Sequence, residues 1–338
     1  MTARRPTIND VAERAGVSKS LVSLALAGSP KVAPASRAAI QAAAEELGYR
    51  RNAAARSLAE RRTRTVGVLA LTLHNPVFAE ILDGVQLRVR ERGHHCVLVT
   101  GDADPQVERN QIEQLLDLQV EGLILIAHRQ DRQSLLEVAQ QLPITVITQP
   151  AEVGFDIDMV SNDDIVGVGL AVDHLVHLGH RQIAHVTGGS SSVAMTRLEG
   201  YRRAMVAHGL GEYLRTADGA FSDDGGYRGA RSLLAEAPEV TALVVANDIA
   251  AIGALAAAEE AGRNVPADLS IICYDGIAMR GLRSIDLTTV AQPLTELGIT
   301  GANLLMDRIE DPSLPPRQIR LAPQLIVRGS TAIAPANR

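Results

Sequence analysis

The stretch TINDVAERAGVSKSLVSLALAG, residues 7–28, decides the fold of the N-terminal part of the chain. Apolar residues recur at helical spacing on both sides of residues 15–18, which predicts two short helices. Gly16 permits a sharp corner between them, and Ser18 is a good N-cap for the second helix. This arrangement is typical of a helix-turn-helix unit, whose second helix enters a DNA major groove. An ordinary helical hairpin fits the same spacing.

Charge is distributed unevenly along the 338 residues, which is enough chain for two to three domains. Residues 1–64 hold 12 Arg and Lys against 5 Asp and Glu, a net charge of +7, whereas the whole chain carries −6. The remaining residues therefore carry −13. A basic N-terminal part on an acidic body indicates that only the former meets a polyanion.

The basic part continues with APASRAAIQAAAEELG, residues 33–48, where helical spacing predicts a third helix. Pro34 suits its first turn, and Gly48 suits its end. Residues 1–48 are therefore predicted to form one three-helix unit. The following residues 49–64, YRRNAAARSLAERRTR, are either a solvated linker or a hinge helix that forms only when DNA orders it.

The body, residues 65–338, alternates short apolar runs with helical patterns, which predicts parallel sheets covered on both faces. Two doubly wound lobes fit the number of units. The predicted strands are VGVLAL (66–71), CVLVT (96–100), GLILIA (122–127), ITVIT (144–148), IAHVTG (183–188), ALVVAN (242–247) and LSIICYD (269–275).

TINDVAERAGVSKSLVS, GYRRNAAARSLA and TVGVLAL, in this order, resemble the lactose-repressor family of bacterial transcription regulators. The resemblance extends to about Val327. It implies a two-lobed body like that of periplasmic binding proteins, with lobe 1 at about 65–162 and 292–328 and lobe 2 at about 163–291. It also implies a cytoplasmic homodimer that represses genes of sugar catabolism by binding a palindromic operator. Whether the assembly is a dimer or a tetramer, and whether the effector is an inducer or a corepressor, stays open.

The resemblance also implies which residues contact double-stranded DNA. The recognition helix would read bases in the major groove, and the leucine of the hinge helix would open the central base step from the minor groove. The implied DNA contacts are Thr7, Ser18, Lys19, Ser20, Ser23, Leu24, Asn52, Ala55 and Leu58. Leu24 stands where many relatives carry Arg, so the operator is expected to differ at that base.

Polar residues at the carboxyl ends of predicted strands are natural ligand contacts, and Asn75, Asn247 and Asp275 occupy such positions. Asn247 and Asp275 also fit simple capping roles, and Asp248 fits an N-cap. With the resemblance, the expected effector is a sugar or polyol, and a nucleobase is a weaker option. The implied ligand contacts are Asn75, Phe78, Gln149, Arg197, Phe221, Asn247, Asp275 and Gln292. Gln149-Pro150 replaces the Asp-Arg of many sugar-binding members.

Other classes of function are disfavoured. GVGLAV, residues 167–172, lacks the third glycine of a dinucleotide fingerprint and lies in a predicted helix. His174, His177 and His180, like GHHC at 93–96, do not match a zinc spacing. We therefore expect no cofactor, no metal and no enzyme activity. A solute-binding clamshell protein of a transport system is the alternative, disfavoured by the basic N-terminal part, the missing signal peptide and the absence of a membrane-spanning stretch.

Overall fold

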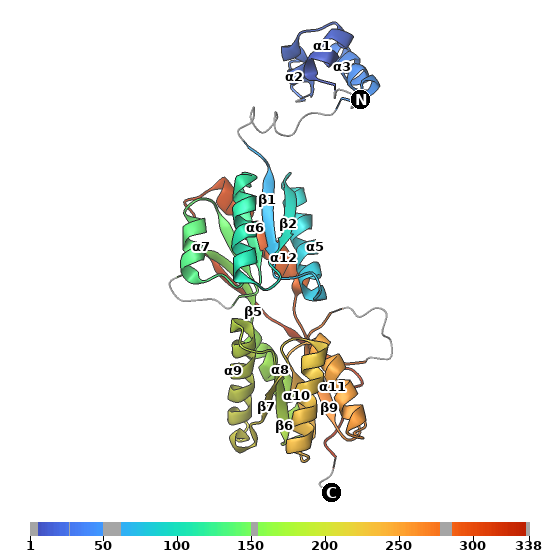
Figure 1. The fold of residues 1–338 in the computed structure, drawn as a ribbon, viewed down its shortest axis with the longest axis vertical. Coiled ribbons are helices and arrows are strands. Elements are labelled where there is room, and N and C mark those ends of the chain that lie inside the picture. The colour runs from blue at the N-terminus through green and yellow to red at the C-terminus, as the bar shows by residue number, and fades with distance from the viewer. Residues whose placement is uncertain (1–5, 27, 50–61, 150–154, 278–285, 336–338) are drawn as a thin grey trace. The chain divides into compact units, whose positions relative to one another are not determined.

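The computed structural model of the chain describes residues 6–26, 28–49, 62–149, 155–277 and 286–335. The chain divides into two compact units, Met1–Thr63 and Arg64–Arg338. Figure 1 shows the helices and strands of each unit. No helix in the described ranges is both long enough and apolar enough to span a membrane.

The first unit contains the three predicted helices, α1 (Ile8–Ala15), α2 (Lys19–Leu26) and α3 (Pro34–Glu46). Thr7 caps α1 through a reciprocal pair of bonds with Asp10, and Gly16 ends it in the left-handed conformation at φ +65°. Val11, Val22 and Ile40 form the centre of the three-helix core. Residues 50–61, which include the predicted hinge helix, lie outside the described residues.

The second unit begins with a lobe built on a six-stranded parallel sheet, ordered β11-β5-β4-β3-β1-β2. Its strands are β1 (Thr65–Ala70), β2 (His95–Thr100), β3 (Gly122–Ile126), β4 (Ile144–Ile147), β5 (Asp158–Asn162) and β11 (Gln318–Leu321). Its helices are α5 (Pro76–Glu91), α6 (Pro105–Asp117), α7 (Arg132–Ala139) and α12 (Leu294–Glu310). Helices α5 and α12 cover one face of the sheet, and α6 and α7 cover the other.

The second lobe repeats this plan on a sheet ordered β12-β10-β9-β8-β6-β7. Its strands are β6 (Ile183–Thr187), β7 (Thr216–Asp218), β8 (Ala242–Val245), β9 (Ser270–Asp275), β10 (Thr288–Ala291) and β12 (Gln324–Ile326). Its helices are α8 (Asp164–His177), α9 (Ser192–Ala207), α10 (Asp223–Glu236) and α11 (Asp248–Glu260). Helices α8 and α9 cover one face, and α10 and α11 cover the other. The prediction of two doubly wound lobes is confirmed.

The chain passes between the lobes three times: after β5, after β10 and between β11 and β12. Two details of the prediction are wrong. Residues up to 328 were expected in lobe 1, but β12 pairs with β10 of the second sheet. This pair is also antiparallel, because β12 returns along the edge of the sheet, so the second sheet is not purely parallel.

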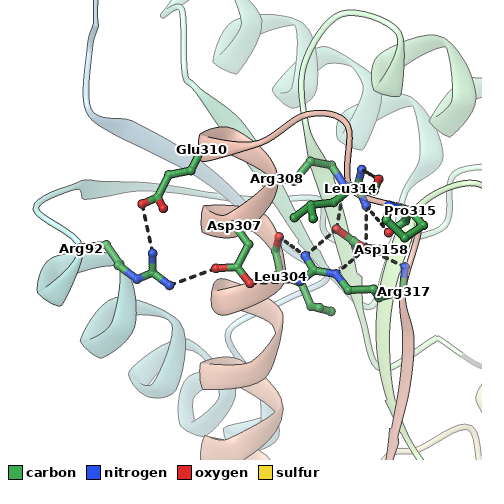
Figure 2. A network of polar contacts seen from close by, with 9 residues as sticks. All are labelled: Arg92, Asp158, Leu304, Asp307, Arg308, Glu310, Leu314, Pro315 and Arg317. Carbon is green, nitrogen blue, oxygen red and sulfur yellow. Dashed lines mark hydrogen bonds and ion pairs between the residues drawn. The ribbon is translucent and has the colours of Figure 1, made fainter.

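A polar network fastens the end of α12 to the first sheet, as Figure 2 shows. Asp158, fully buried at the start of β5, accepts hydrogen bonds from the side chains of Arg308 and Arg317. Arg317 also reaches Asp307, whose carboxylate binds Arg92 beyond the end of α5. These ion pairs join β5, α12, β11 and α5, so residues distant in sequence complete one lobe.

Candidate functional site

The exposed face of α2 carries four of the predicted DNA contacts. Lys19, Ser20, Ser23 and Leu24 are exposed, whereas Val22 on the opposite side is buried against α1 and α3. This exposed row of four side chains offers one ammonium donor, two hydroxyl groups and one apolar side chain. Such a mixture can address base edges and thymine methyl groups in a major groove.

The other predicted DNA contacts lie beside this face or outside the described residues. Ser18 is exposed and caps α2, because its hydroxyl accepts from the Leu21 amide at 3.2 Å. The Thr7 hydroxyl is already engaged with Asp10 at 2.8 Å. Asn52, Ala55 and Leu58 fall in residues 50–61, which the structure does not describe.

The body contains a cavity of about 940 Å³ that residues from both lobes line. This volume lies at the upper end of the range of small-molecule sites, roughly 300–1,000 Å³. Its lining residues follow the carboxyl ends of strands in both sheets, where parallel α/β folds bind their ligands. Seven of the eight predicted ligand residues line the cavity: Asn75, Phe78, Gln149, Arg197, Phe221, Asp275 and Gln292.

Asn247 does not line the cavity. Its side chain is fully buried, and its Oδ1 caps α11 by accepting from the Ala250 amide at 2.8 Å. Asn247, and not Asp248, is therefore the N-cap, so the prediction for Asp248 is wrong. Asp248 instead accepts from the Ile277 amide at 2.8 Å and from the Thr289 hydroxyl at 2.9 Å, which holds the loop after β9.

Arg197, on α9, is the buried cation of the cavity. Its Nε donates to Asp164 at 3.0 Å, and its Nη1 donates to Asp275 at 3.2 Å and to the Ala246 carbonyl at 2.6 Å. The guanidinium carbon lies 3.8 Å from the centre of the Tyr274 ring. Burial disfavours the charged form, but the two carboxylates outweigh burial and raise the pKa of Arg197. The guanidinium is therefore charged and held in one orientation.

Asp275 ends β9 with a left-handed backbone, at φ +104°. Its Oδ1 accepts from Arg197 and, at 2.7 Å, from the Gln292 amide. Burial raises the pKa of the Asp275 carboxyl to about 7, against the attraction of Arg197. The hydrogen bonds of Asp275 and Arg197 with described residues use Oδ1, Nε and Nη1, which leaves Oδ2 and Nη2 to meet a ligand. An acceptor beside donors suits a hydroxyl group, which both gives and takes a hydrogen bond.

Gln149 connects the lobes at the cavity. Its Nε2 donates to the His128 carbonyl at 3.0 Å, and its Oε1 accepts from the Ser192 hydroxyl of the second lobe at 2.5 Å. In the first lobe Asn75 caps α5 by accepting from the Val77 amide at 3.1 Å, so part of its side chain is already used. Both side chains therefore serve the protein fold as well as facing the cavity.

Sequence reasoning missed several lining residues: Arg129, Thr148, Asp164, Asp218 and the segment 190–192. Asp164 follows β5 and Asp218 is the last residue of β7, two strands too short and too polar to be predicted. Once these strands are known, the rule that ligands meet the carboxyl ends of strands would have found both residues. Within the described ranges, His, Cys, Asp and Glu side chains form no cluster of three that could hold a metal ion.

A helix-turn-helix unit joined to a two-lobed body, whose cavity is lined by both apolar and hydrogen-bonding side chains, defines the class of ligand-responsive DNA-binding regulators. Residues 7–52 match the family described as bacterial regulatory proteins, lacI family, and residues 172–331 match the periplasmic binding protein-like domain. The chain belongs to the lacI family of bacterial regulatory proteins, because its similarity to a member also extends over nearly its whole length. It is 36% identical to the ribose operon repressor of Escherichia coli (strain K12) over 96% of this chain and 99% of that protein.

Two solved structures extend the comparison. The lac repressor dimer bound to operator superposes with a TM-score of 0.87 at 28% identity, covering 97% of this chain and 100% of that one. The complex of the transcriptional regulator CelR with cellobiose gives a TM-score of 0.72 at 32% identity, covering 96% and 100%. The fold predicted from the sequence is thereby confirmed.

Proposed function

We propose that this protein is a transcriptional repressor that binds a palindromic operator as a homodimer and responds to a sugar or polyol bound in the cavity of the body. The observation that carries the proposal is the hydrogen-bonded Arg197–Asp275–Gln292 cluster, which lines the same cavity as Phe78 and Phe221. Such a site binds hydroxyls on one side and the apolar face of a sugar ring on the other.

In this proposal the exposed row on α2 reads base edges, and Ser18 contacts phosphate, which positions the helix without specifying sequence. Thr7 and Asn52 are proposed as further phosphate contacts. Ala55 and Leu58 would enter the minor groove, where Leu58 wedges a base step open. A bacterial regulator meets its operator in the cytoplasm, and we assign the cavity a binding role and no catalytic one.

The effector would act on DNA affinity through the closure of the two lobes. Coupling between two binding sites is reciprocal, so an effector that weakens operator binding must itself bind less tightly to the operator complex. The names of similar proteins make D-ribose and cellobiose the first compounds to test, because a ribose operon repressor and a cellobiose complex are among them.

The test begins with a thermal-shift screen of D-ribose, cellobiose, other sugars, polyols, sugar phosphates and nucleobases. A ligand at a hundred times its Kd adds about 2.7 kcal/mol of stability, which raises the Tm by several degrees. The same hits are then tested for a change in affinity for duplexes enriched from a random DNA pool. Equal DNA affinity with and without saturating ligand would contradict the regulatory switch.

Variants of two cavity residues, Arg197 on α9 and Asp275 at the end of β9, show whether a hit binds in the cavity. Arg197→Ala and the milder Asp275→Asn should both abolish the thermal shift and leave DNA binding in place. Arg203→Ala is the matched control, because Arg203 lies on the same helix, is exposed and pairs only locally with Glu199 among the described residues. A shift that survives both cavity variants would contradict the assignment of the effector site.

A further inference from the structure

The ring of Phe221 lies flat against the backbone of Gly188, which follows β6. A methyl group at Gly188 would overlap the ring atoms Cζ, Cε1 and Cε2 of Phe221. Gly188 has no left-handed backbone that would by itself call for glycine. Its missing side chain therefore makes room for the ring, and both residues line the cavity.

The backbone that carries Phe221 is strained. Ala220 and Phe221 have φ angles of +47° and +55°, the left-handed region that residues with a side chain rarely adopt. Two consecutive residues of this kind persist only where their surroundings hold them. The conformation turns the chain between β7 and α10 so that the ring reaches Gly188.

Asn247, which follows β8 and caps α11, makes one such contact with Phe221. Its Nδ2 donates to the carbonyl oxygen of Phe221 at 3.3 Å, while its Oδ1 caps α11. Asn247 is completely buried and does not line the cavity, so it reaches a ligand only through the residues that it positions.

The ring also approaches the charged group of the site. The guanidinium carbon of Arg197 lies 5.7 Å from the centre of the Phe221 ring, within the range of cation–π attraction. Gly188, Arg197 and Asn247 thus all lie against Phe221, and its ring offers an apolar surface next to the hydrogen-bonding cluster.

We propose that Gly188 and Asn247 are positioning residues of the effector site, which act by holding the Phe221 ring as a stacking surface for the apolar face of the ligand. This inference rests on the proposed function for its ligand, but the positioning can be measured without one. It also changes the role of Asn247, which the sequence had suggested as a direct ligand contact.

Fluorine NMR on protein labelled with 4-fluorophenylalanine tests the positioning directly, because the chain contains only three phenylalanines, Phe78, Phe155 and Phe221. The Phe221→Leu variant identifies the Phe221 resonance, because that resonance is missing from its spectrum. Gly188→Ala removes the space for the ring, and Asn247→Ser keeps a helix cap but loses the amide donor. We expect both variants to shift the Phe221 resonance and to leave that of Phe155, in the core of the other lobe, unchanged.

Gly169→Ala is the matched control, since a methyl group at this helical glycine meets nothing within 4 Å. It should leave all three resonances in place. An unchanged Phe221 resonance in a folded Gly188→Ala protein would overturn the proposal, as would equal shifts at Phe155 and Phe221.

A double-mutant cycle connects the positioning to binding, with D-ribose and cellobiose as the probes in calorimetric titrations. For whichever sugar binds, Gly188→Ala should raise the Kd about tenfold in the wild-type background. In the Phe221→Ala background the same substitution should raise the Kd less than twofold. A tenfold loss in both backgrounds would show that Gly188 acts independently of the ring. If neither sugar binds the wild-type protein, D-ribose and cellobiose are excluded as effectors, and the NMR result alone decides the positioning.

Discussion

Arg308 holds Asp158 through two hydrogen bonds, 2.8 Å from Nε and 3.0 Å from Nη2, although 150 positions separate the two residues in the chain. The carboxylate is fully buried, and the backbone amide and side chain of Arg317 occupy its remaining sites. The pair (Figure 2) attaches α12, which enters the first lobe from the second, to the strand β5.

Replacing Asp158 by Asn should destabilise the body by about 3 kcal/mol, because two arginines lose their buried counter-ion. Urea unfolding monitored by circular dichroism measures the loss. Asp173→Asn is the control, since Asp173 is half-exposed and pairs with the partly exposed His208. A loss below 1 kcal/mol for Asp158→Asn would contradict the role of the network.

The pKa of the Asp158 carboxyl also predicts how the stability of the body changes with pH. Burial alone would raise the pKa of Asp158, but the hydrogen bonds from Arg308 and Arg317 outweigh it, and the pKa lies below its usual value. A lowered pKa in the folded state contributes stability that is present above the unfolded value and is lost as the pH falls. The difference in stability between wild type and Asp158→Asn should therefore shrink below about pH 4. A difference that stays constant down to pH 2 would disprove this.

Effector binding should strengthen as the pH rises from 6 to 8. Burial raises the pKa of Asp275 to about 7, and its ionised form is the stronger acceptor because neither oxygen carries a proton. A hydroxyl donating to the carboxylate favours the ionised form, so binding releases a proton. Calorimetric titration at several pH values, with a hit from the ligand screen, measures the trend. Any binding that remains in Asp275→Asn should lose this dependence, and a flat wild-type profile would argue against a contact with Asp275.

Lys19→Ala should weaken operator binding by roughly 1–3 kcal/mol and relax sequence preference at one base pair, because Lys19 is exposed on the proposed reading face. Titrations against the selected operator and its single-base variants measure both effects. A uniform loss on all sequences, with a smaller salt dependence, would instead assign Lys19 to a phosphate. Lys31→Ala, which removes an exposed lysine outside α2, is the control for charge alone.

Strong local patterns made most of the fold predictable. The apolar runs that became β1, β3 and β9 bury every residue or all but one, so hydrophobicity alone marks them. By contrast, β5 reads Asp-Met-Val-Ser-Asn and is buried because arginines distant in the chain neutralise Asp158. Pairing with distant partners cannot be inferred from local periodicity. This is why β5, β11 and β12 were not predicted.

The candidate site could likewise be predicted only in part. Seven cavity residues were suggested by their positions and by the resemblance, whereas the role of Asn247 depended on tertiary structure. A capping asparagine and a ligand contact look alike in sequence, and the full burial of Asn247 and its bonds to the Ala250 amide and the Phe221 carbonyl separate them. Asp164 was missed because the strand before it was not recognised.

The strands β11 and β12 form one edge of each sheet, and both lie in the last part of the described chain. During synthesis on the ribosome, the nascent chain therefore exposes β5 and β10 as open edges until these two strands emerge. Neither lobe can reach its final form before the segment that carries its own edge strand, β11 or β12, has emerged. A premature stop codon before residue 318 would leave both lobes unfinished, so damage at that point should appear as aggregation or proteolysis of the whole body.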